Sequence, residues 1–121
     1  MKRVGMKLAL LAAGLWLLSG CHSSRISATV ENRTGAGITL LEVDYPSASF
    51  GADALAGGAA YHYRFKVQGS GPVKVQYTAA DGHSTKQASG PTLYEGQEGT
   101  LTIVLMPEGK IEFLPELTPR K

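Results

Sequence analysis

From residue 26 onward, apolar and polar residues alternate in short runs separated by turns rich in glycine and proline. The clearest run is 61–68, in which two tyrosines, a phenylalanine and a valine alternate with polar or charged residues, and 73–78 repeats the pattern. A period of two places successive side chains on opposite faces of a β-strand. Since no helical period follows residue 21, the pattern predicts an all-β fold.

We expect strands where the alternation persists and turns at the intervening glycines and prolines. Residues 38–45 and 101–106 are apolar on both faces or nearly so, which predicts central strands. Residues 83–89 are polar apart from Ala88 and predict an edge strand protected by Lys86. The expected strands are 26–31, 38–45, 49–55, 61–68, 73–78, 83–89, 101–106 and 111–114, with a short one at 92–94.

Strands with turn signals about every eight to twelve residues are typical of a sandwich or a small barrel. We expect a single antiparallel β-sandwich of about seven strands, immunoglobulin-like or transthyretin-like. A sandwich is preferred to a barrel because the strands differ in exposure. The sandwich should span 26–114, followed by an extended or frayed tail at 115–121. The side chains expected in the core are Val30, Val43, Tyr63, Phe65, Val75, Leu101 and Ile103.

The N-terminal segment 1–20 differs from the rest of the chain. Basic residues lie within 1–7, an apolar run of eleven residues covers 8–18, and Ser19 and Gly20 follow. This order is typical of a secretory signal peptide. The apolar run is too short to span a bilayer as a helix, which needs about 20 residues. An uncleaved membrane anchor and a buried N-terminal helix are the alternatives.

The segment ends in Leu18-Ser19-Gly20-Cys21, which contains the only cysteine of the chain. This tetrapeptide resembles the lipobox of bacterial lipoproteins. Over residues 1–21 the resemblance implies lipid transfer to the Cys21 thiol, cleavage before Cys21, and acylation of the new amino group with a fatty acid such as palmitate. Residues 21–25 would then form a short lipidated tether, and several acyl chains on one residue would anchor it stably. A free thiol or an intermolecular disulfide is the alternative for Cys21.

The residue after the cysteine is His22, not the aspartate that favours inner-membrane retention in enteric bacteria. The resemblance therefore implies an outer-membrane location, facing the periplasm. Three of the twelve basic residues precede Cys21, which leaves nine Lys and Arg against ten Asp and Glu in the remainder. This balance provides no basic field for nucleic acid. With Cys21 lipidated, no cysteine is left for an internal disulfide, so the hydrophobic core alone must stabilise the domain.

Candidate catalytic and metal-binding residues are sparse. His22, His62 and His83 are far apart in sequence, whereas a metal site needs clustered ligands. No Gly-x-Ser-x-Gly element and no paired carboxylate arrangement stands out. We therefore expect no catalytic residue, no metal and no cofactor, and we interpret the histidines as solvated surface residues.

One set of charged residues suggests a contact surface. His62, Arg64 and Lys66 share a face of one expected strand, and Lys74 lies on the next. If these strands pair, the four residues form a partly basic patch for an anionic partner such as lipopolysaccharide or an acidic protein. The alternative is an ordinary solvated sheet face, with cross-strand pairs to the acidic residues of 38–45.

Three tyrosines suggest a second kind of site. Tyr45, Tyr61 and Tyr94 would line a small sugar or peptide cleft if they were exposed together, and would otherwise complete the core. The first hypothesis is therefore a non-catalytic, lipid-anchored interaction or assembly module that contacts an envelope protein. The second is a small-ligand or carbohydrate-binding module, and the third is an enzyme such as a small hydrolase.

Overall fold

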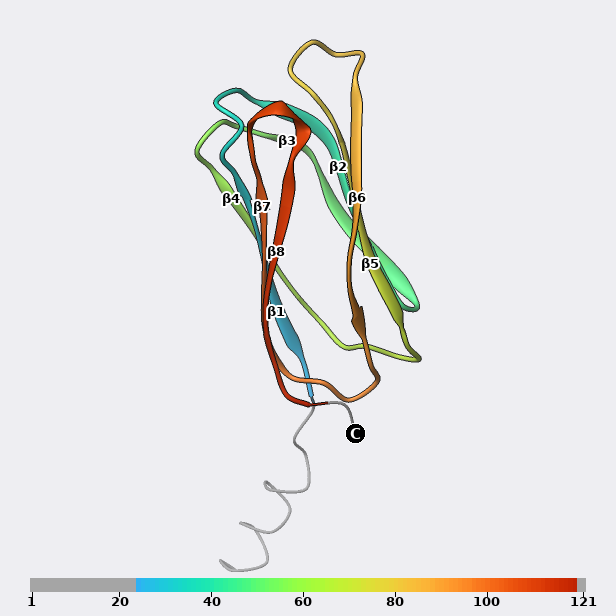
Figure 1. Ribbon diagram of the computed structural model, residues 1–121. Coiled ribbons are helices and arrows are strands. Elements are labelled where there is room, and N and C mark those ends of the chain that lie inside the picture. The colour runs from blue at the N-terminus through green and yellow to red at the C-terminus, as the bar shows by residue number, and fades with distance from the viewer. Residues whose placement is uncertain (1–23, 120–121) are drawn as a thin grey trace, which may run out of the picture.

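The computed structural model describes residues 24–119, which form eight β-strands and one short 3₁₀ helix (Figure 1). The expected signal peptide and Cys21 lie outside these residues. Within the described part of the chain, no helix is long and apolar enough to cross a membrane. The elements are β1 (Ile26–Asn32), β2 (Ile38–Tyr45), β3 (Ala48–Leu55), β4 (Ala60–Phe65), β5 (Gly71–Thr78), β6 (Thr85–Leu93), β7 (Gly99–Leu105), η1 (Pro107–Gly109) and β8 (Ile111–Leu117).

The strands form two four-stranded sheets that face each other. Sheet A has the order β4-β1-β7-β8, and sheet B has the order β3-β2-β5-β6. The predicted all-β sandwich is confirmed, and β2 and β7 are interior strands as expected. The pairing is not purely antiparallel, because β1 runs parallel to β7. The chain between β1 and β7 is long enough to supply the crossover that a parallel pair needs.

Several strand boundaries differ from the prediction. β4 ends at Phe65 because its partner β1 begins at Ile26, directly opposite. β8 continues to Leu117 because β7 begins at Gly99, which lies opposite it. Residues 115–117 therefore belong to sheet A and not to a tail, and Pro115 is accommodated because β8 is an edge strand. The polar strand expected at 83–89 and the short strand expected at 92–94 are replaced by one continuous strand, β6, at the edge of sheet B.

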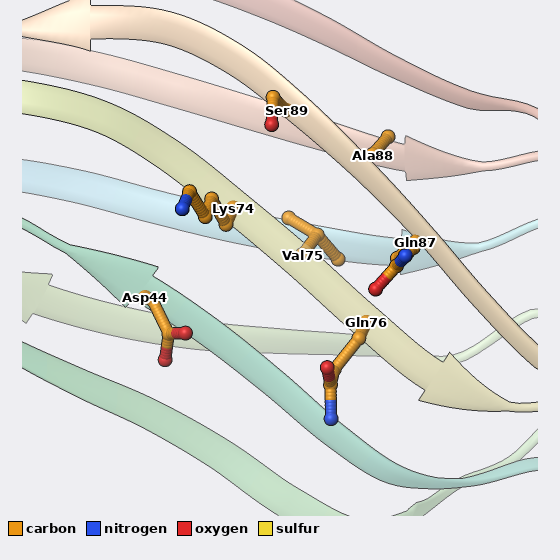
Figure 2. A pocket seen from close by; sticks show the side chains of 7 residues that line it. All are labelled: Asp44, Lys74, Val75, Gln76, Gln87, Ala88 and Ser89. Atoms are coloured by element: carbon orange, nitrogen blue, oxygen red, sulfur yellow. The ribbon is translucent and has the colours of Figure 1, made fainter.

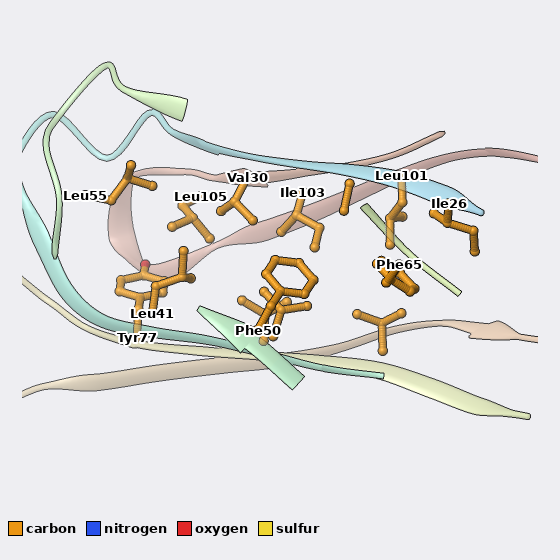
Figure 3. Close-up of a cluster of buried hydrophobic side chains, with 14 of the residues drawn as sticks. Ile26, Val30, Leu41, Phe50, Leu55, Phe65, Tyr77, Leu101, Ile103 and Leu105 are labelled. Atoms are coloured by element: carbon orange, nitrogen blue, oxygen red, sulfur yellow. The ribbon is translucent and has the colours of Figure 1, made fainter. Parts of the chain in front are cut away.

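The core lies between the sheets and is filled by alternate side chains from both (Figure 3). Six of the seven side chains predicted to lie in the core are buried there. Tyr63 is the exception, with 39% of its surface exposed. The prediction was wrong at this position because β4 is an edge strand, so its inward-facing residues reach the margin of the sandwich.

A buried amide fixes one end of the sandwich. Asn32, the last residue of β1, is fully buried. Its Nδ2 donates hydrogen bonds to the carbonyl oxygens of Ala36 and Leu55, both at 2.9 Å. Its Oδ1 accepts hydrogen bonds from the Thr34 amide at 3.1 Å and the Thr34 hydroxyl at 2.8 Å. One side chain thus ties the β1–β2 turn to the end of β3, and every polar atom of the amide is satisfied.

The two ends of the sandwich carry different elements. β1 begins at one end, beside the start of β7 and the end of β8, and we call this the entry end (Figure 1). The β1–β2 turn, the β5–β6 hairpin and the β7–β8 turn lie at the opposite end, which we call the far end. Any chain that precedes β1 therefore joins the domain at the entry end.

Candidate functional site

The residues of the predicted basic patch are divided between the two sheets. His62 and Arg64 lie on the outer face of β4 in sheet A, and Lys66 follows the end of that strand. Lys74 lies on β5 in sheet B. The strand pairing on which the patch depended does not occur, because the β4–β5 connection crosses from one sheet to the other. Val67, buried to 1% exposure, anchors this crossing in the core.

His62 and His83 have ordinary surface surroundings, and His22 lies outside the described residues. The Nδ1 atom of His62 lies 3.0 Å from the Thr29 hydroxyl, on the neighbouring strand β1. His83 lies in the β5–β6 hairpin, where its amide donates to Asp81. The Ser84 hydroxyl and the amides of Ser84 and His83 donate to Asp81 and hold the pKa of its carboxyl well below the usual range. Across residues 24–119, no three His, Cys, Asp or Glu side chains lie close enough together to hold a metal ion.

The outer face of sheet B carries acidic, basic and amide side chains in turn. Lys74 lies directly opposite Asp44 on β2 and Ser89 on β6, as expected for a solvated sheet face. Figure 2 shows these residues with Gln76 and Gln87 around a shallow depression of about 410 Å³. The depression offers hydrogen-bond donors and acceptors to a polar partner.

A strained β-bulge lies on the same face. β2 has one more residue than β5 between Thr39 and Glu42, and Leu40 within this bulge has a φ of 52°. The left-handed region is rare for a bulky residue and marks strain. The bulge turns Leu40 outward, where 64% of its surface is exposed, while Leu41 remains in the core. Leu40 therefore places an apolar side chain among the polar groups of sheet B.

The bulge depends on a glycine of the adjacent strand. A Cβ atom at Gly51 on β3 would collide with the carbonyl oxygen of Leu41. Beside this contact, a groove of about 690 Å³ runs over β2 and β3 past Leu40 and Phe50 to Tyr61. Sequence reasoning missed this feature, although the apolar pair Leu40–Leu41 interrupts the alternation and could have indicated a bulge.

Two of the three tyrosines proposed for a cleft, Tyr45 and Tyr61, both pack against Phe50. Tyr45 stacks on Phe65, with ring centroids 4.1 Å apart. The ring centroid of Tyr61 lies 6.1 Å from that of Phe50. Tyr94 is half-buried in the β6–β7 connection at the entry end. This placement does not support a cleft in which the three tyrosines are exposed together.

Aromatic rings close the side of the sandwich between β3 and β4. Tyr63 stacks on Phe50 at a centroid distance of 4.5 Å, and Phe50 itself is 6% exposed. Burial, with a smaller contribution from the charge of Tyr63, raises the pKa of Tyr45 at the same margin. Aromatic pairs of this kind stabilise a fold beyond the area they bury. This cluster therefore has a sufficient structural role in joining the two sheets.

No protein-family model matches the chain, and no curated protein matches it. The fold is similar to that of a solved structure, the NMR structure of a protein from Eubacterium rectale, with a TM-score of 0.55. The two sequences are 11% identical, and the match covers 81% of this chain and 91% of the other. At this identity the similarity extends to the fold alone.

Proposed function

We propose that the chain is a lipoprotein anchored through Cys21 on the periplasmic side of the outer membrane, with a non-catalytic sandwich that serves as an interaction or assembly module. We further propose that the sandwich is of the immunoglobulin-like or transthyretin-like type. The observation that carries the proposal is the lipobox-like Leu18-Ser19-Gly20-Cys21 at the end of a signal-like segment, with β1 beginning a few residues later.

The short tether supports a fixed orientation on the membrane. Between Cys21 and Ile26 the chain can span at most about 17 Å. Ile26 is fully buried, so the folded domain begins at this residue. A lipid on Cys21 would therefore hold the entry end close to the bilayer and leave the far end and the outer sheet faces accessible.

The bulged face of sheet B is the best contact surface for a protein partner. Leu40 is a large apolar side chain exposed in the middle of a strand, at a backbone position that is itself strained. Glu42 and Gln76 line the same groove as Leu40, and Lys74 lies farther along this face, opposite Asp44. An apolar centre inside a polar rim is the usual anatomy of a protein interface.

The anchor is tested by acyl labelling and membrane fractionation in bacteria. Cys21→Ser should abolish incorporation of labelled palmitate and release the protein from the membrane fraction, because the only acceptor thiol is lost. Ser23→Ala is the matched control and should behave as the unaltered chain. Continued labelling and membrane association of Cys21→Ser would refute the anchor. His22→Asp should shift the labelled protein towards the inner membrane.

The contact surface is tested by photo-crosslinking in cells. A photoreactive residue at Leu40 should form a discrete adduct with an envelope protein, and one at Thr102, on the outer face of sheet A, should not. The adduct at position 40 should require Cys21, because anchoring restricts which partners the domain meets. Absence of an adduct at position 40, or the same adduct at both positions, would contradict this assignment of the surface.

A further inference from the structure

The far end of the sandwich contains a pocket that the sequence did not indicate. It lies between the β1–β2 turn, the β5–β6 hairpin and the β7–β8 turn, and has a volume of about 270 Å³. We call it the far-end pocket. Ala36, Ile38, Ala79 and Met106 give it an apolar lining. Figure 3 shows Tyr77, which also lines the pocket, at the same end of the core as Leu55.

Tyr77 brings a hydroxyl without a partner into this pocket. The side chain is 2% exposed, yet its hydroxyl makes no hydrogen bond within the described part of the chain. No fully buried side-chain oxygen or nitrogen among these residues lacks a partner. The Tyr77 hydroxyl must therefore reach the open space of the far-end pocket. Burial raises the pKa of Tyr77, so the phenol remains a hydrogen-bond donor at neutral pH.

Lys86 supplies a positive charge to the lining of the same pocket. It lies on β6 directly opposite Tyr77, so its side chain starts on the inward face of sheet B. Its stem crosses Gly109, where a Cβ atom would lie 2.8 Å from Lys86 Cδ. Asp81 and Glu108 also line the pocket, but among residues 24–119 neither forms an ion pair with Lys86.

Protection of an edge strand accounts for part of this arrangement. An inward-pointing lysine on an edge strand discourages pairing with another chain. That role needs neither a pocket nor a neighbouring hydroxyl. The Asp81 carboxylate accepts hydrogen bonds from His83 and Ser84 in its own turn and makes no ion pair with Lys86.

We propose that the far-end pocket binds a carboxylate that carries a short apolar group. The carboxylate would accept hydrogen bonds from Lys86 Nζ and the Tyr77 hydroxyl, and the apolar group would lie against Ile38 and Met106. A charged donor beside a neutral one suits a carboxylate better than an amide or an alcohol. A free short-chain acid and the C-terminal residue of a peptide share this chemistry. The site lies opposite the entry end and does not depend on the lipid anchor.

The test is an NMR titration of the isotope-labelled full chain in an uncharged detergent. The probes are N-acetyl-leucine, which mimics a peptide C-terminus, isovalerate, which is a free acid, and N-acetyl-leucinamide, which lacks the charge. We expect at least one acid to shift the amide signals of Ala36, Ala79 and Gly109, with a Kd of about 1 mM, as is usual for so small a ligand. Tighter binding of N-acetyl-leucine indicates a peptide C-terminus, and equal or tighter binding of isovalerate indicates a free acid.

Three variants test the contributions of individual side chains to binding. Lys86→Met retains the stem over Gly109 but removes the charge, and should weaken binding about tenfold. Tyr77→Phe retains the ring and should weaken binding about threefold to tenfold. Lys74→Met, on the outer face of sheet B, should leave binding unchanged. Absence of binding by both acids, equal binding of the amide, or undiminished binding by both Lys86→Met and Tyr77→Phe would overturn the proposal.

Discussion

Replacement of the buried amide Asn32→Asp tests how one side chain holds the far end together. The substitution preserves size and both acceptor contacts with Thr34. It removes the donor that serves Leu55 and Ala36 and turns a carboxylate oxygen towards their carbonyl oxygens. Because Asn32 is fully buried, water cannot replace the lost bonds without local opening.

The magnitude follows from these contacts. The bond to Leu55 is buried, and loss of a donor to a buried acceptor costs about 1–3 kcal/mol. The bond to Ala36 is only partly buried, so its loss costs about 1 kcal/mol. With the burial of a carboxylate, the free energy of unfolding should fall by about 3 kcal/mol.

Urea and thermal unfolding, followed by circular dichroism, measure this loss. For a domain of this size, 3 kcal/mol lowers the Tm by about 15 °C and the urea midpoint by about 2 M. Gln87→Glu makes the same chemical change at an exposed position of β6 and should alter stability by less than about 0.5 kcal/mol. If the two variants unfold alike, the hydrogen bonds of Asn32 do not hold the two turns together.

Three further substitutions probe backbone and burial. Gly90→Ala places a methyl group 2.5 Å from the Phe113 ring and should lower the free energy of unfolding, measured with urea, by about 2 kcal/mol. Gly71→Ala, where the nearest atom lies 3.5 Å away, should change stability little, and equal effects of the two variants would contradict the close contact. Leu40→Asn replaces a leucine in the left-handed backbone region with a residue that tolerates it, and should raise the free energy of unfolding by about 1 kcal/mol. A lower free energy of unfolding would mean that Leu40 packs within the domain. Burial raises the pKa of Tyr77 above its ordinary 10.0, so Tyr77 ionises more readily in the unfolded chain and the free energy of unfolding falls as the pH rises past about 10. Tyr77→Phe should make this fall less steep in unfolding measurements up to about pH 11, and an unchanged slope would refute the prediction.

The alternation of apolar and polar residues predicted which side chains face the core. It was a poorer guide to which strands lie side by side. The segments that became β4 and β5 have the same pattern and lie next to each other in sequence, yet they belong to different sheets. A period of two specifies the face of a strand but carries no information about its partner. The decisive residue is Val67, which continues the alternation of β4 but is buried in the crossing between sheets.

Other features require the backbone to be known. The pair Leu40–Leu41 predicted a central strand, which β2 is, but the exposed Leu40 results from a bulge and not from burial on both faces. The expected strand 26–31 ends before Asn32, and the contact of Asn32 with Leu55 joins positions far apart in sequence. Such contacts depend on which strand ends meet at the far end, and local pattern does not specify this.

The far-end pocket and the lipid anchor should be separable because they lie at opposite ends of the domain. Tyr77 and Lys86 become neighbours only through the register of β5 with β6, which is independent of how β1 is tethered. Cys21→Ser should therefore abolish membrane association while leaving the affinity for N-acetyl-leucine or isovalerate unchanged. Lys86→Met should weaken acid binding in either background and leave acyl labelling intact. Loss of acid binding in Cys21→Ser would show that the pocket forms only in the anchored protein, contrary to a domain whose core is closed from Ile26 onward.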